Sequence, residues 1–180
     1  MMRALLDVRR HTRRMWTFLA TLAGGLVALL GSVVTTYYVQ RQAIEAERRA
    51  RATRAADEIM TAVTALRDLP GEPESAEPTR WTEWSNKKDS LIDQVEAQAL
   101  ILPSRDLRER LAFIVLALRD PEDLRDFAGW SEGGSRQILC KEAINYLGVF
   151  YRGEPLPPER PVILRARNAI EEGTEYRNQE

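Results

Sequence analysis

The stretch that decides the fold runs from Met15 to Val39 and reads MWTFLATLAGGLVALLGSVVTTYYV. No charged residue lies between Arg14 and Arg41, so an α-helix over these positions has no charged face to turn toward water. Such a helix rises about 37 Å, more than the roughly 30 Å of a bilayer's hydrocarbon core. We therefore predict a single transmembrane helix over residues 15–39.

The residues that flank this stretch are those that flank membrane spans. Trp16 lies at one end and Tyr37 and Tyr38 lie at the other, where aromatic side chains meet the lipid headgroups. A basic tail, residues 1–14, holds five arginines. We expect these basic flanks to contact the bilayer through its anionic headgroups.

Small side chains recur at every fourth position within the predicted span, at Ala20, Gly24, Ala28 and Ser32. Such a row lets two helix backbones approach closely, which predicts self-association through this face. Glycine and alanine are also common in spans that stay single. Both interpretations therefore remain open.

After the span, residues 40–69 contain neither glycine nor proline and are rich in alanine, arginine and glutamate. This composition predicts that the helix continues as a stalk. Its first part is charged on nearly all faces, whereas apolar positions at helical spacing begin further along. Those positions are Ala52, Ala56, Ile59, Val63 and Leu66. We therefore expect the stalk to pack against other helices only at its far end.

A proline-rich acidic loop, residues 70–79, ends the stalk and leads to residues 80–173. Apolar spacing there predicts a bundle of about four shorter helices, followed by a polar tail at 174–180. The most apolar of these helices has only eight uncharged residues, Leu111 to Leu118, too few to cross a bilayer. That helix is expected at the centre of the bundle, with an apolar face at Leu107, Leu111, Ile114, Val115 and Leu118 extended by Phe113 and Leu116.

Two details of the bundle complete the predicted fold. The segment Ser131–Ser135, which reads SEGGS, is expected to be a flexible turn, and the last helix is expected to end at Gly173. The fold class is therefore all-α, with one transmembrane helix, a long stalk helix and a small bundle. This arrangement is similar to that of many small bacterial proteins with one N-terminal span, a resemblance that carries no activity.

The counts of histidine and cysteine exclude several chemistries. His11 is the only histidine, which excludes histidine-based metal sites and Ser–His–Asp triads. Cys140 is the only cysteine, so no intrachain disulfide can form, and its place inside a predicted helix indicates a packed apolar side chain. No motif for a catalytic site, a cofactor or a metal is present, so we expect no enzyme.

Charge is distributed unevenly along the chain. Residues 1–54 hold ten arginines and three acidic residues, a net charge of +7. Residues 55–180 hold 16 basic and 24 acidic residues, a net charge of −8. An acidic bundle argues against nucleic acid as a partner.

Two functions remain compatible with the sequence. The first is an interaction, scaffold or regulatory module that recruits an unknown protein partner to the membrane. The alternative is a ligand-sensing bundle whose pocket is lined by Trp81, Trp84 and Trp130, although paired tryptophans are also common as core anchors.

The side of the membrane on which the bundle lies depends on the arginines. Five of them precede the span and five follow it closely, which gives a tie under the positive-inside rule. A tail with five arginines resists translocation, which favours a bundle outside the cytoplasm. A chain started at Met15 would instead keep only the second group, which would place the bundle in the cytoplasm. The single cysteine agrees with a reducing compartment. We therefore predict a cell-membrane protein with a cytoplasmic bundle.

Overall fold

The computed structural model describes the backbone of residues 2–73 and 78–177, and the side chains of these residues from Ser32 onward except Phe127. The chain divides into two compact units, Met1–Arg49 and Ala50–Glu180, each considered by itself below. The described ranges contain helices, turns and loops and no strand, which confirms the all-α prediction.

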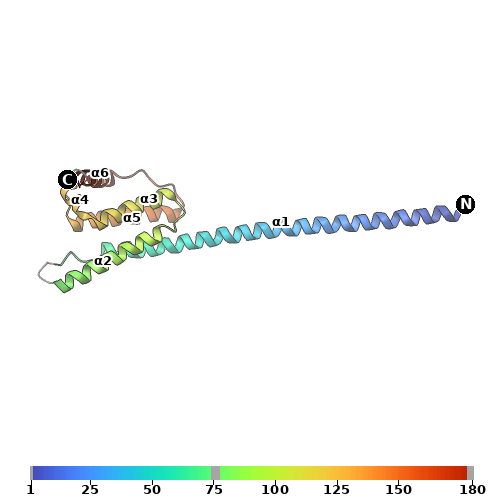
Figure 1. Cartoon of the computed structure of the whole chain (residues 1–180), viewed down its shortest axis with the longest axis horizontal. Helices are drawn as coiled ribbons and strands as arrows, with labels where there is room; N and C mark the ends of the chain where they lie inside the picture. The colour runs from blue at the N-terminus through green and yellow to red at the C-terminus, as the bar shows by residue number, and fades with distance from the viewer. Residues whose placement is uncertain (1, 74–77, 178–180) are drawn as a thin grey trace. The chain divides into compact units, whose positions relative to one another are not determined.

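Six helices form the described parts of the chain (Figure 1). They are α1 (Met2–Arg67), α2 (Pro78–Ala99), α3 (Arg105–Arg119), α4 (Pro121–Ala128), α5 (Glu132–Arg152) and α6 (Pro161–Arg177). Five helices therefore follow α1 where about four were predicted. The stalk helix ends two residues before Leu69, and α2 takes in the last two residues of the predicted 70–79 loop, of which 74–77 lie outside the described residues.

The first unit consists of the initial part of α1. Every described side chain from Ser32 to Arg49 is exposed. Within the described residues, no helix offers a segment that is both long and apolar enough for a membrane crossing. Most of the predicted span, with Ala20, Gly24 and Ala28, lies outside the described side chains, so the span stays a prediction.

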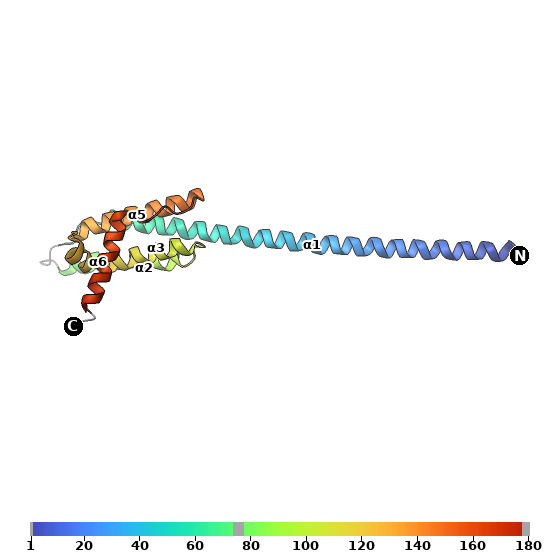
Figure 2. The same ribbon diagram turned by 90° about the horizontal axis from the view of Figure 1, so that it is seen from above.

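The second unit is built on the last turns of α1. All five apolar positions predicted there are buried, which confirms the stripe: Ala52, Ala56, Ile59, Val63 and Leu66. Figure 2 shows α2, α3 and α5 running in nearly the same direction as these turns, whereas α6 runs across that direction. The stripe shares one continuous core with side chains from α2, α3, α4, α5 and α6.

The central position predicted for α3 is confirmed. All five residues of its predicted apolar face are buried, as is Phe113. The expected extension to Leu116 is wrong, because this side chain is 52% exposed on the outer side of the helix. Ile92 and Tyr146 also belong to the core.

The predicted flexible turn at Ser131–Ser135 is instead the start of α5. Ser131 is the N-cap, and its hydroxyl accepts a hydrogen bond from the Gly134 backbone N–H at 3.2 Å. The Ser135 hydroxyl donates to the backbone carbonyl oxygens of Ser131 and Glu132. The Ser131 cap satisfies a backbone N–H that the start of a helix leaves unpaired, which offsets part of the cost of two adjacent glycines in the first turn.

The last helix also continues beyond its predicted end at Gly173, as far as Arg177. Gly173 is buried against Asp123 of α4, where a β-carbon would lie only 2.3 Å from Asp123 Oδ1. One turn later, the Arg177 guanidinium donates to both carboxylate oxygens of Asp123, at 2.6 and 2.9 Å. Glycine is therefore needed here for the close approach of α6 to α4, and the predicted tail at 174–180 is helical over its first four residues.

We expect Gly173→Ala to lower the free energy of unfolding by about 2 kcal/mol, because the added methyl group must displace the buried carboxylate of Asp123. Thermal unfolding followed by circular dichroism measures the change. Gly133→Ala in α5 is the matched control, since a β-carbon there meets nothing within 4 Å. Equal melting temperatures for the two variants would contradict the close approach.

Candidate functional site

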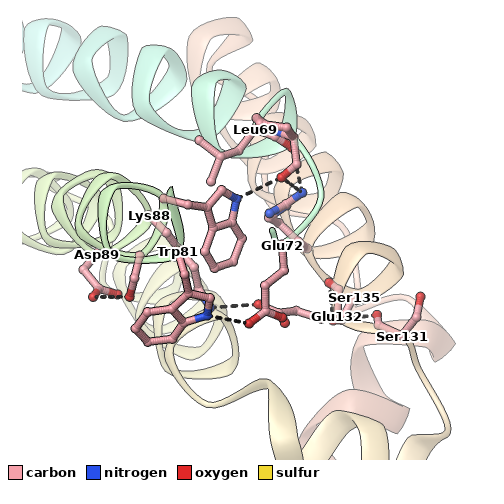
Figure 3. A network of polar contacts seen from close by, with 12 residues as sticks. Leu69, Glu72, Trp81, Lys88, Asp89, Ser131, Glu132 and Ser135 are labelled. Atoms are coloured by element: carbon pink, nitrogen blue, oxygen red, sulfur yellow. Dashed lines mark hydrogen bonds and ion pairs between the residues drawn. The ribbon is translucent and has the colours of Figure 1, made fainter. Parts of the chain in front are cut away.

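Segments far apart in the sequence meet at one end of the second unit. The loop after α1, the start of α2, the junction of α3 with α4 and the start of α5 line an open cleft of about 310 Å³. Its lining residues are mostly charged or polar: Glu72, Trp81, Trp84, Ser85, Lys88, Arg119, Asp120, Pro121, Glu122, Arg125 and Glu132. Figure 3 shows the polar contacts in this region.

Trp84 and Arg136 attach the loop after α1 to the bundle. The Trp84 indole Nε1–H donates to the Pro70 carbonyl oxygen at 2.9 Å. The Arg136 guanidinium donates to the carbonyl oxygens of Leu69 and Pro70, at 2.7 and 3.1 Å. Because carbonyls just beyond a helix have no helical partner, these bonds satisfy groups that would otherwise be left unpaired.

Two cations lie close to the Trp84 ring. Lys88 Nζ is 5.3 Å from the ring centre and Arg136 Cζ is 5.7 Å from it, within the range of cation–π attraction. Lys88 also forms an ion pair with Glu132 at 3.0 Å, and its side chain is only 12% exposed. This pair explains why a lysine is accommodated on the face of α2 that also carries the buried Trp84, Ile92 and Val95. Glu132 in turn lies in the first turn of α5, where the helix dipole favours a negative charge.

Trp81 and Glu72 form the outer part of the network. The Trp81 ring is 43% exposed, and its Nε1–H donates to Glu72 Oε1 at 3.0 Å. A hydrogen bond with Glu132, then that of Trp81, and to a smaller degree the charge of Lys88, lower the pKa of the Glu72 carboxyl. Two carboxyl groups and a lysine are thus held beside an indole ring that remains accessible to water.

The three tryptophans predicted to share a pocket do not all line this cleft. Trp81 and Trp84 do, whereas Trp130 is not among its described lining residues and packs, half-buried, against the core. Sequence reasoning missed Glu72, Glu132 and Arg136. The one available signal was Lys88, because a lysine among apolar positions of a helix implies a charged partner on a neighbouring segment.

Cys140 lies outside the cleft and is fully buried in α5, as its place inside a helix predicted. Burial raises the pKa of its thiol to about 12, although the charges of Arg136 and Arg67 act in the opposite direction. A thiol with so high a pKa is almost entirely protonated at neutral pH and is a poor nucleophile. Among the described residues, no group of three or more His, Cys, Asp or Glu side chains is placed to hold a metal ion.

We expect the Cys140 thiol to react at least 100-fold more slowly with a thiol reagent at pH 8 in the folded protein than in denaturant, because both burial and the raised pKa suppress the thiolate. Absorbance of the released chromophore follows the reaction. Ser90→Cys provides an exposed thiol on α2 as a control for reagent access. Fast modification of Cys140 without unfolding would show that α5 opens locally.

No protein-family model, curated protein or solved structure matches this chain. The binding properties of the cleft therefore have to follow from its own residues. Those residues place an exposed indole ring among charges of both signs.

Proposed function

We propose that this chain is a single-pass membrane protein whose helical bundle binds a partner protein, as a scaffold or regulatory module without catalytic chemistry of its own. The observation that carries the proposal is the exposed Trp81 ring in a cleft with charged walls. Tryptophan and arginine are the residues on which protein–protein binding energy most often concentrates. Arg119 and Arg125 line the same cleft.

Cleft chemistry favours a protein partner over a small apolar ligand. Small-molecule sites are mostly apolar with few polar groups, whereas charged residues dominate this lining. Trp84, the second tryptophan of the cleft, is 7% exposed and already uses its N–H on Pro70. The alternative, a ligand-sensing bundle with an aromatic pocket, therefore has weaker support.

Membrane anchorage is supported by the uncharged stretch 15–39 and by the arginines on both sides of it. In this proposal those arginines contact anionic lipid headgroups, and Ala20, Gly24, Ala28 and Ser32 provide a face through which two spans associate. The arginines on the two sides of the span are equal in number, so the proposed position of the bundle on the cytoplasmic side of the cell membrane is supported by the single cysteine.

The proposal is tested in cells by placing the photoreactive residue p-benzoylphenylalanine at Ser85, which lines the cleft. We expect a discrete crosslinked product in the membrane fraction that resists carbonate extraction. Lys141, exposed on α5 and outside the cleft lining, is the control position.

Two outcomes would contradict separate parts of the proposal. Equal crosslinking from both positions, or none from Ser85, would show that the cleft is not the partner site. Release of the intact chain by carbonate would show that residues 15–39 do not anchor it.

A further inference from the structure

The turn between α2 and α3 exposes two large apolar side chains next to each other. Leu100 is 75% exposed and Ile101 is 50% exposed, whereas the following residue, Leu102, is buried. Each Å² of apolar surface exposed to water costs about 25 cal/mol of free energy. Two adjacent exposed side chains would therefore be stabilised by contact with an apolar environment. We call residues 100–103 the apolar corner.

The apolar corner has a fixed backbone. The backbone N–H groups of Ile101 and Leu102 donate to carbonyl oxygens of the last turn of α2, at 3.1 and 3.2 Å. From α3, the Arg108 guanidinium donates to the carbonyl oxygens of Leu102 and Pro103. Because the backbone is already held and Leu102 is buried, binding through the two exposed side chains requires little further ordering.

The apolar corner lies at the end of the second unit where that unit's part of α1 begins, at Ala50, as both views show (Figures 1 and 2). The end of α5 lies there as well, since the Tyr151 hydroxyl donates to Asp57 Oδ1 of α1 at 2.5 Å. The charged cleft, lined by the first turns of α2 and α5, lies at the opposite end. The two exposed features of the unit therefore face in opposite directions.

Positive charge gathers around the apolar corner. Residues 50–57, 99–110 and 149–156 hold six arginines and four carboxylates, although the chain after residue 54 has a net charge of −8. Two of those arginines and two of those carboxylates balance each other in the ion pairs Arg105–Glu109 at 2.6 Å and Arg152–Glu154 at 2.8 Å. Arg108 is bonded to backbone carbonyls, which leaves its positive charge in place.

We propose that the apolar corner binds the surface of a lipid bilayer, with Leu100 and Ile101 inserted at the level of the headgroups and the surrounding arginines in contact with anionic lipids. Segments that bind at the membrane interface typically combine apolar side chains with nearby basic residues. This inference rests on the membrane anchorage proposed above, because only ten residues, 40–49, lie between Val39 and Ala50. So short a connection keeps the bundle within reach of the headgroups.

Membrane contact at this end gives the opposite end a defined role. A bundle seated on the bilayer through the apolar corner presents the Trp81 cleft away from the lipid. The cleft is then available to a partner in solution, and the same contact limits how far the bundle can tilt.

The test uses the full chain with Cys140→Ala and a single new cysteine, Leu100→Cys, labelled with the environment-sensitive dye NBD. The protein is reconstituted into vesicles of phosphatidylcholine and phosphatidylglycerol, with and without doxyl-labelled lipid. Asn86→Cys, exposed on α2 and about 20 Å from position 100, is the matched control. We expect blue-shifted NBD emission at position 100 and at least twofold stronger quenching by doxyl lipid there than at position 86.

Two further measurements separate insertion from other causes. Ile101→Asp in the Leu100→Cys protein should lower the quenching to the level of position 86, because a charge opposes insertion. Replacing phosphatidylglycerol by phosphatidylcholine should weaken the quenching, because the arginines lose their counter-charges.

The remaining outcomes overturn the inference in distinguishable ways. If the protein floats with the vesicles but positions 86 and 100 are quenched equally, the apolar corner does not touch lipid and the anchor stands. A blue shift without lipid quenching, growing with the number of chains per vesicle, would show that a second copy covers the corner. If the protein fails to float, the anchor itself is wrong and the inference falls with it.

Discussion

The second unit depends on the burial of one apolar stripe on α1, from Ala52 to Leu66. Its small members, among them Ala56, let neighbouring helices approach closely, and its large members, Ile59, Val63 and Leu66, are fully covered. Burial of apolar area is the main favourable term in folding, so the unit has no complete core without these turns of α1. The helix that carries the predicted span is therefore also a structural part of the bundle.

Periodicity made the helical core readable from the sequence, because a 3.6-residue repeat places Ala52, Ile59 and Val63 on one face whatever they later touch. The start of α5 and the end of α6 could not be read in this way. Glycine weakens a helix locally, whereas the Ser131 cap and the contact of Gly173 with Asp123 belong to the folded structure. The low helix propensity of glycine therefore predicts a break at these two positions. The helix nevertheless forms there, because a cap or a close helix contact compensates for the cost of glycine.

The candidate site was only partly readable for a related reason. Trp81 and Trp84 stand out because they are close in sequence, but Arg136 binds a carbonyl oxygen 67 residues earlier in the chain. Glu72 and Glu132 come from a loop and from the first turn of a helix, which no sequence spacing connects. Proximity between such residues is a property of the fold, so the polar network could not be inferred before the packing of the helices was known.

The pairing of Asp123 with Arg177 also bears on the order of events during synthesis. Asp123 is 4% exposed once α6 is in place, and its guanidinium partner follows it by 54 residues. Until the ribosome has made α6, this carboxylate has no partner and has to stay hydrated, because burying an unpaired charge is costly. Residues 15–39 emerge much earlier, so in the proposed membrane-anchored protein the nascent chain would reach the bilayer while α4 is still uncovered. The contact of α4 with α6 therefore forms only after α6 has been synthesised.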